Sequence, residues 1–231
     1  MKAAVFNLDN IKLGKEELAD ERLVRLQEIF NSKKITPIQI ELVNMDQIKD
    51  SEVILSIEAK KIDLIISDLD YVAERLTKEL TEEERILFLK CKEILEKEQF
   101  LFEILNLQQR KFLKGYPLMT ILPIVLAKDE DSIDNEILFR LHQMAGRICF
   151  FTAGDKEARA WSLREGQTAY EAAGCIHSDI QKGFIRAEVM ALDDLFKAGH
   201  YNQAKNEGKL RLENKDYLVQ DGDLILFRFN K

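Results

Sequence analysis

The sequence has little cysteine, proline or glycine, and it has no long apolar run. Its 231 residues include three cysteines, three prolines and ten glycines. Cys91, Cys149 and Cys175 are far apart and odd in number, which argues against a disulfide framework and against a zinc knuckle. No apolar run approaches the ~20 residues that span a bilayer, and the N-terminus becomes polar too early for a signal peptide. We therefore expect a cytoplasmic protein with no bound metal.

The composition that remains is ordinary for a soluble globular protein, with 46% hydrophobic and 32% charged residues. The net charge of -7 is unevenly distributed. From Arg147 onward the chain carries thirteen basic and thirteen acidic residues, so the excess of acid lies in the first 146 residues. An acidic front half disfavours broad binding of phosphate backbones there, whereas a local basic patch stays open in the neutral segment.

Apolar periodicity predicts a mixture of buried strands and helices in the first 146 residues. The expected strands are residues 3–6, 38–43 and 118–127, and the expected helices are residues 15–30 and 134–145. Residues 53–107 contain no proline or glycine and predict two long helices that form an antiparallel hairpin, a coiled coil. Thr81 and Glu84 have the spacing of a capping box at the start of its second helix. An α/β sheet with an inserted helical hairpin fits this pattern best.

The last 85 residues predict a compact α+β domain. Apolar or alternating runs at residues 148–154, 157–163 and 183–189 indicate strands, and a short helical piece lies between the second and the third. Asp221-Gly222, followed by the apolar run 224–229, is a strong local hairpin signal because glycine accepts the positive φ of a tight turn.

Residues 147–231 resemble the C-terminal domain of the YchF/Obg-like ATPases. The matching stretches are Phe-Phe-Thr-Ala-Gly at 150–154, Ala-Ala-Gly-Cys-Ile-His-Ser-Asp at 172–179, Gly-Phe-Ile-Arg-Ala-Glu-Val at 183–189 and Val-Gln-Asp-Gly-Asp at 219–223. In that family this region is a TGS domain, a ubiquitin-like β-grasp fold that occurs in translation-associated proteins. A weaker resemblance extends upstream and includes residues 67–76, which look like the start of the coiled-coil insertion of the family.

The resemblance implies a P-loop after the first strand, but the residues needed there are missing. A P-loop requires glycines, so that backbone N–H groups can wrap phosphates, and a Lys-Ser/Thr pair for phosphate and Mg²⁺. Here the leading glycine position is Asn7, and the Gly-Lys-Ser positions fall at Lys12-Leu13-Gly14. Asp9 would place a negative charge against phosphate. We interpret this segment as an eroded P-loop.

Two further nucleotide elements of the family have also changed. The switch II Asp-x-x-Gly position is Asn44-Met45-Asp46-Gln47, in which Asn44 is a poor partner for magnesium-bound water and Gln47 replaces the glycine. The base-specificity element falls at residues 129–132 and does not match. We therefore expect no catalytic residues, no cofactor and no enzymatic activity.

The resulting hypothesis is a non-catalytic, ribosome- or RNA-linked binding or regulatory module. The proposed partner-binding residues are Arg159, His177, Lys182 and Arg186, although surface solubility and a turn-capping histidine explain them equally well. The alternatives are a weak ATP- or GTP-binding homologue that uses unorthodox contacts, and an adaptor that binds a protein partner through the helical hairpin.

The expected fold is therefore α/β plus α+β. Residues 1–146 are predicted to form a shortened P-loop-NTPase-like α/β sheet with the helical hairpin at 53–107, and residues 147–231 to form the TGS-like β-grasp domain.

Overall fold

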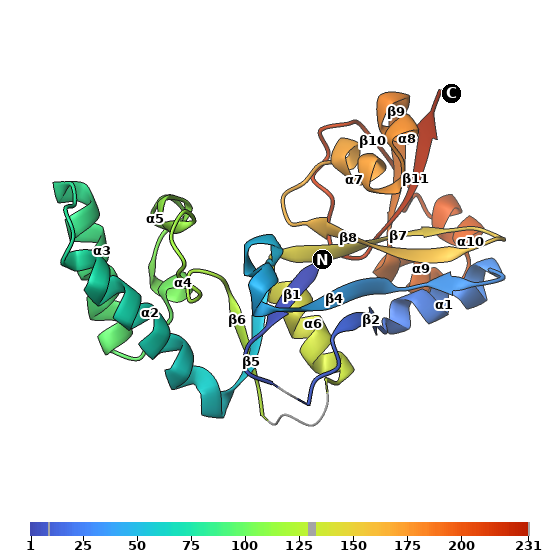
Figure 1. Cartoon of the computed structure of the whole chain (residues 1–231). Helices are drawn as coiled ribbons and strands as arrows, with labels where there is room; N and C mark the ends of the chain where they lie inside the picture. Colours follow the sequence, from blue (N-terminus) through green and yellow to red (C-terminus); the bar gives the residue numbers. More distant parts are fainter. Residues whose placement is uncertain (9, 129–132, 231) are drawn as a thin grey trace. The chain divides into compact units, whose positions relative to one another are not determined.

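The computed structural model describes residues 1–8, 10–128 and 133–230, which form two compact units (Figure 1). Unit 1 consists of residues 1–16 and 40–145, and unit 2 of residues 17–39 and 146–231. The sequence-based division placed residues 17–39 in the front half. They group with the C-terminal residues instead, because helix α1 (Glu21–Phe30) packs on two strands of unit 2, β7 (Arg147–Ala153) and β8 (Ala158–Arg164).

Unit 1 is built on a five-stranded sheet of order β2-β4-β1-β5-β6. Its strands are β1 (Lys2–Val5), β2 (Gly14–Leu18), β4 (Ile38–Asn44), β5 (Val53–Ile57) and β6 (Ile124–Ala127). β1 pairs in parallel with β4 and with β5, and β5 pairs in parallel with β6. β5 is buried along its whole length, as an interior strand of a parallel sheet should be. The chain therefore has the mixed α/β character that its sequence predicts.

Three segments in unit 1, or next to it in sequence, differ from their predicted structure. Residues 15–18 belong to strand β2, because Asp20 caps the helix through the N–H of Arg22 and α1 begins only at Glu21. Residues 53–57 form β5 instead of the start of a long helix. Of the predicted strand 118–127, only β6 forms: the N–H groups of Met119 and Thr120 donate to the buried carboxylate of Asp68, so they are not available to a neighbouring strand.

The helices of unit 1 follow β5 and β6. They are α2 (Lys61–Leu76), α3 (Glu82–Glu96), α4 (Leu101–Ile104), α5 (Leu107–Leu113) and α6 (Asn135–Met144), with the 3₁₀ segments η1 (Met45–Asp50) and η2 (Glu58–Lys60). α2 and α3 lie side by side (Figure 1), and Val72, Phe88 and Leu95 belong to their common apolar cluster. The capping box predicted at Thr81 and Glu84 is confirmed. No helix among the described residues has both the length and the apolar character needed to cross a membrane.

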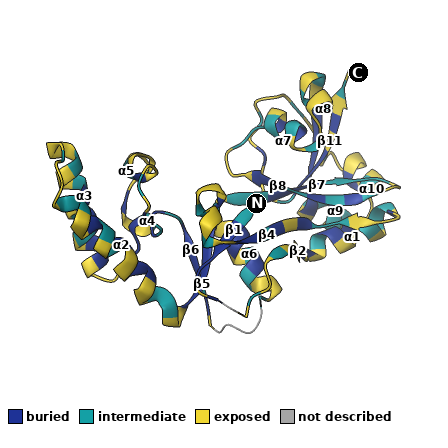
Figure 2. Cartoon of the chain, viewed as in Figure 1, coloured by how far each residue is buried: buried dark blue, intermediate teal, exposed yellow. Residues whose placement is uncertain are grey.

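Unit 2 is built on a six-stranded sheet of order β10-β9-β11-β7-β8-β3. The strands not yet named are β3 (Ile35–Thr36), β9 (Phe184–Ala191), β10 (Arg211–Glu213) and β11 (Asp223–Phe229). β7 and β8 are antiparallel neighbours, and β11 runs parallel to β7 and antiparallel to β9. Figure 2 shows the buried residues concentrated along β7 and β11, near the middle of this sheet.

Helices cover both faces of this sheet. On one face, α7 (Ala169–Ile176) packs against an apolar cluster that contains Phe150, Val189 and Phe227. The short helix α8 (Ser178–Lys182) follows it. On the other face, the guanidinium of Arg22 in α1 lies 5.0 Å from the ring centroid of Phe151. The helices α9 (Leu192–Ala198) and α10 (Tyr201–Asn206) lie beside α1, because Arg25 stacks on Phe196 and Phe30 contacts Tyr201.

The predicted hairpin at Asp221-Gly222 does not form. Gly222 has the positive φ, +84°, that the turn requires, but β11 does not pair with the segment before it. It enters the sheet between β7 and β9, and residue 218 forms only an isolated bridge to Thr168. A local turn signal predicts the conformation of the turn, whereas the partner strand is chosen by contacts that are distant in sequence.

Candidate functional site

The segment after β1 is where the resemblance places a P-loop. Asn7, at the leading glycine position, adopts the left-handed conformation with φ of 52°. The N–H of Ile11 donates to the carbonyl of Leu8 at 3.4 Å. Lys12 and Leu13 are exposed, and the chain then enters strand β2. Asp9, the residue expected to repel phosphate, lies outside the described residues.

The predicted switch II position begins at the end of the neighbouring strand. Asn44 is the last residue of β4, and its side chain makes no capping hydrogen bond to η1, the helix that follows. Gln47 lies in η1, and its side-chain oxygen accepts a hydrogen bond from Nζ of Lys2 at 3.1 Å. The predicted base-specificity element at residues 129–132 lies outside the described part of the chain. Asn7 and Asn44 thus stand at the carboxyl ends of two adjacent parallel strands.

Two of the four predicted partner-binding residues lie together. His177 and Lys182 line an open groove of about 750 Å³, with Asp179, Gly183 and Asn230 among the other lining residues. Nδ1 of His177 accepts a hydrogen bond from the N–H of Asp179 at 3.1 Å, so the histidine caps α8. This contact supports the structural explanation of His177, and a capping role leaves its other ring nitrogen available for contacts.

Arg159 is held on the face of the sheet that carries α7. Its guanidinium lies 3.9 Å from the ring centroid of Trp161, two residues along β8. Trp161 in turn stacks on Phe150 and donates from its indole nitrogen to Oγ1 of Thr152. Trp161 is therefore fixed by the core, and Arg159 covers it as a cation–π partner.

Arg186 lies on the opposite face. It is exposed on β9 and stands directly across from Arg228 of β11, while its neighbours along the chain, Ala187 and Val189, point into the α7 cluster. Arg228 forms an ion pair with Glu188, a glutamate that is only 7% exposed. The structure therefore does not bring the four predicted residues into one site.

A small cavity opens on the same face as Arg186. Its volume is about 140 Å³. Its floor comes from the sheet and its walls from α1, α10 and the segment before β10, and the lining residues are Phe30, Ala153, Glu188, Met190, Tyr201, Leu210, Leu224, Ile225 and Leu226. No sequence pattern singled out this group, because its members come from six segments.

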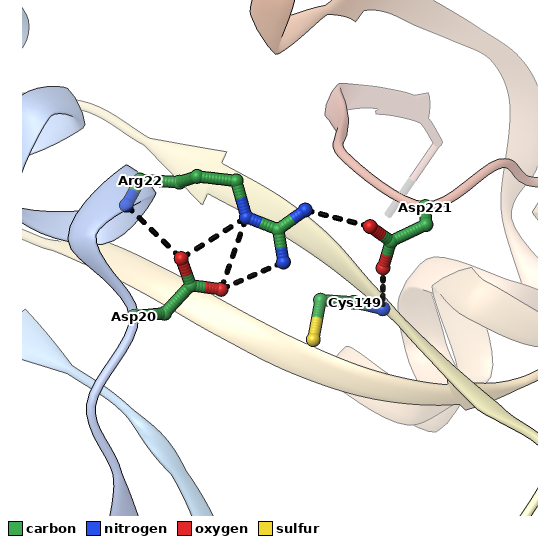
Figure 3. Close-up of polar contacts among 4 residues, drawn as sticks. All are labelled: Asp20, Arg22, Cys149 and Asp221. Atoms are coloured by element: carbon green, nitrogen blue, oxygen red, sulfur yellow. Dashed lines mark hydrogen bonds and ion pairs between the residues drawn. The ribbon is translucent and has the colours of Figure 1, made fainter. Parts of the chain in front are cut away.

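A half-buried arginine, Arg22, joins α1 to the turn before β11 (Figure 3). The guanidinium of Arg22 donates to both carboxylate oxygens of Asp20, at 2.7–3.1 Å, and to Asp221 at 2.6 Å. The other oxygen of Asp221 accepts from the N–H of Cys149 at 2.7 Å. Burial opposes the charge of Arg22, but Asp20 and Asp221 outweigh it and hold the pKa of the guanidinium above its usual value. This cluster fixes residues 17–39 to the rest of unit 2.

The cysteines show no sign of catalytic use. Burial, and next the charge of Asp221, raises the pKa of the Cys149 thiol to about 12, and burial together with Asp68 does the same for Cys91. Neither thiol is a nucleophile at neutral pH, because the thiolate is the reactive form. Among the residues with assigned positions, no group of three or more His, Cys, Asp or Glu side chains could hold a metal ion.

Comparisons with known proteins match the C-terminal part most closely. Residues 148–230 match the family model YchF-GTPase_C, described as a protein of unknown function (DUF933). The "Ribosome-binding ATPase YchF" of Bacillus subtilis is 48% identical over 105 residues, which cover 46% of this chain and 28% of that protein. The protein of the same name from Mycoplasma genitalium is 30% identical over 244 residues, which cover 98% of this chain and 63% of that one. The matches thus span between about a quarter and two thirds of the length of these relatives.

The fold is shared with a solved structure. The Schizosaccharomyces pombe YchF GTPase is similar with a TM-score of 0.75 and 16% sequence identity, over 99% of this chain and 97% of that one. At this identity the likeness establishes the fold alone.

The expectation that the chain is not an enzyme is contradicted by these comparisons. It was based on the missing P-loop residues. The relatives that the chain matches are named ATPases, including one that matches over almost all of this chain. Unusual residues at a phosphate-binding loop change how a phosphate can be held, but they do not by themselves exclude nucleotide binding.

Proposed function

We infer that the chain belongs to the YchF/Obg-like ATPase family, and from this premise we propose that it is a ribosome-associated protein whose unit 2 makes the contact. Two observations carry this proposal: residues 148–230 match the YchF-GTPase_C family model, and a relative that is 48% identical over 105 residues is named as ribosome-binding. Ribosome association would place the chain in the cytoplasm.

The architecture of unit 2 supports a TGS-like, β-grasp domain as the binding part. The hairpin β7–β8 is followed by α7, and the last strand, β11, is inserted parallel to the first, between it and β9. This arrangement supports the β-grasp expectation. Arg186 and Arg228 lie opposite each other on one of its faces. Glu188 neutralises one of these two charges, and the remaining positive charge suits a phosphate-rich partner.

Co-sedimentation of the full chain with purified ribosomes tests this function. The chain should pellet with ribosomes at low salt in a saturable manner, and raising the salt should release it, because contacts with phosphates release counterions. Unlabelled chain should compete with labelled chain for the same sites. Pelleting that does not saturate, or that is equal with and without ribosomes, would refute the proposal.

Unit 1 supplies a second function, hydrolysis of ATP or GTP, which the naming of the relatives as ATPases favours. Ligands of open α/β sheets bind outside the carboxyl ends of the strands, and here that edge carries Asn7 and Asn44 on adjacent strands. The left-handed conformation of Asn7 is one that a leading glycine would adopt readily. In this proposal Lys12 contacts phosphate, and Asn44 and Gln47 replace the usual switch II residues, so we expect slow turnover.

Release of inorganic phosphate from MgATP and MgGTP tests the second function. Lys12→Ala should lower the rate, while Lys15→Ala, an exposed lysine of β2, should leave it unchanged. A rate equal to that of buffer alone, or equal losses in both variants, would overturn the proposed site.

A further inference from the structure

The face of the unit 2 sheet that carries Arg186 has an apolar row open to solvent. Leu212 of β10 and Leu226 of β11 flank Glu188 of β9 in direct cross-strand register. Leu212 is 61% exposed and Leu226 is 56% exposed, whereas Glu188 is 7% exposed. Large aliphatic side chains so exposed beside a buried carboxylate are typical of a binding surface.

The cavity of about 140 Å³ described above opens beside this row and is lined by Glu188 and Leu226. Ala153, at the end of β7, is the smallest lining residue, and its short side chain leaves space above the floor of the cavity. Phe30 and Tyr201 form part of the wall, with ring centroids 5.5 Å apart and planes tilted by 57°. An apolar cavity of about 150 Å³ accepts a benzene ring, so this one has room for a single six-membered aromatic ring.

Two polar side chains of the cavity, Glu188 and Tyr201, determine which ring it would prefer. Glu188 lines the cavity and already accepts one bond from Arg228, but an ionised carboxylate has about four acceptor positions. Tyr201 lines the same cavity, and burial, and next the charge of Glu188, raises the pKa of its hydroxyl. A ring that presents an amino group to Glu188 would therefore be favoured.

A pair of cations lies next to the cavity. Arg186 and Arg228 are directly opposite each other on neighbouring antiparallel strands, and both are exposed. Like charges in this position repel each other; the ion pair of Arg228 with Glu188 offsets part of this repulsion, and an anion that contacts both guanidinium groups would offset more of it. Two guanidinium groups are well suited to a phosphate.

We propose that this face binds single-stranded RNA and that the cavity between Phe30 and Tyr201 receives a cytosine base. The base lies over Ala153, its amino group donates to Glu188, and the backbone phosphate contacts Arg186 and Arg228. The inference deepens the proposed ribosome association by naming the class of ligand and its subsite. Cytosine follows from the chemistry: a purine is larger than the cavity, and uracil would present a carbonyl oxygen to the carboxylate where cytosine presents a donor.

Fluorescence anisotropy of the full chain with labelled single-stranded oligonucleotides of about 10 residues tests the proposal. Oligo-C should bind on the order of tenfold more tightly than oligo-U, since one hydrogen bond to a charged group discriminates them. Glu188→Gln should abolish most of that preference. Ala153→Leu fills the floor of the cavity without changing charge and should weaken binding of both oligonucleotides, with the larger loss for oligo-C.

Substitution of Arg186 should change RNA affinity and its salt dependence in a different way from substitutions in the cavity. Arg186→Ala should weaken oligo-C and oligo-U by the same factor and reduce the slope of log affinity against log salt by about one. Arg85→Ala, at an exposed arginine of α3 in unit 1, is the control and should change neither quantity. Circular dichroism and urea unfolding of each variant separate loss of binding from loss of fold.

The result that overturns the inference is equal affinity for oligo-C and oligo-U, or binding that Ala153→Leu leaves intact in a folded variant. A protein partner on this face would instead give two results together. The wild type would bind no oligonucleotide, and Ala153→Leu would lose co-sedimentation with ribosomes. Co-sedimentation that survives in every variant refutes the subsite and leaves the proposed function standing. Pocket-dependent oligo-C binding without co-sedimentation refutes the proposed function and leaves the subsite standing.

Discussion

At the scale of single residues, Arg22 is the side chain on which the attachment of α1 depends. Arg22→Met keeps the length of the side chain but leaves Asp20, whose side chain is 6% exposed, without its ion-pair partner. Losing the partner of a buried charge costs the desolvation of that charge. We expect the free energy of unfolding, measured with urea, to fall by about 2 kcal/mol. Arg25→Met on the same helix removes only a stack on Phe196 and should cost about 0.5–1 kcal/mol; equal losses would contradict the role of Arg22.

Gly183 is required for a different reason, namely space. A Cβ atom at this position would lie 2.0 Å from the carbonyl oxygen of Asn230, so the end of β11 would have to move. Gly183→Ala should lower the free energy of unfolding by about 1–3 kcal/mol, as overpacking does. Gly154 has open space around its would-be Cβ and a negative φ, and Gly154→Ala should change stability by less than about 0.5 kcal/mol. The comparison fails if the two alanine variants are equally stable.

Residues that act locally were predictable, and residues that act across the chain were not. The capping box at Thr81 and the capping role of His177 follow from neighbours within three positions, where the geometry of a helix start determines the partner. Arg22 and Asp221 are 199 positions apart, and nothing in the sequence pairs them. The cavity beside Glu188 was missed for the same reason, because sheet register brings its lining residues together.

At the scale of elements, the short strand β3 is attached to β8 through side chains as well as backbone. Thr36 donates to Glu157, and Lys34 forms an ion pair with the same carboxylate. The hydrogen bond from Thr36 is the largest cause that holds the pKa of Glu157 below its usual value. Because the folded pKa is lowered, the carboxylate stabilises the fold above the unfolded pKa, and this contribution is lost as pH falls through the folded pKa.

Glu157→Gln should therefore lower the free energy of unfolding at pH 7, by less than about 1 kcal/mol because the pair is partly exposed. The difference from the wild type should shrink as pH falls below the usual glutamate range. Urea unfolding at a series of pH values measures it. On a Thr36→Val background the same substitution should have a smaller effect. A difference that is constant with pH would show that the charge of Glu157 is not what attaches β3.

Amphipathic helices of ordinary length were predicted well, whereas strands that lead into helices were not. α6 forms at its predicted position, with Asp134 as its cap. In contrast, residues 53–57 and 61–76 are continuous in composition, with no proline or glycine between them. The sequence therefore predicts one helix over both segments and misses β5. A short, wholly apolar strand has no period of its own, and it becomes a strand because β1 and β6 pair with it on both sides.

At the scale of the whole molecule, residues 17–39 change the domain picture. They include the last two residues of β2 and the first two of β4, yet they supply α1 to unit 2 and β3 to its sheet. The C-terminal match at residues 148–230 therefore does not contain the complete unit. Phe30, from this segment, also forms part of the wall of the cavity proposed to receive a base.

Site-specific photo-crosslinking to purified ribosomes tests the central claim, that unit 2 contacts the ribosome through the sheet face that carries Arg186 and Leu226. A photoreactive amino acid replaces Leu226, which is 56% exposed, or, as a control of equal exposure, Ile86 of α3, which is 59% exposed. We expect position 226 to form a ribonuclease-sensitive adduct with ribosomal RNA, several-fold more abundant than any adduct from position 86. The account would be contradicted by adducts of equal yield from both positions, or by none from position 226.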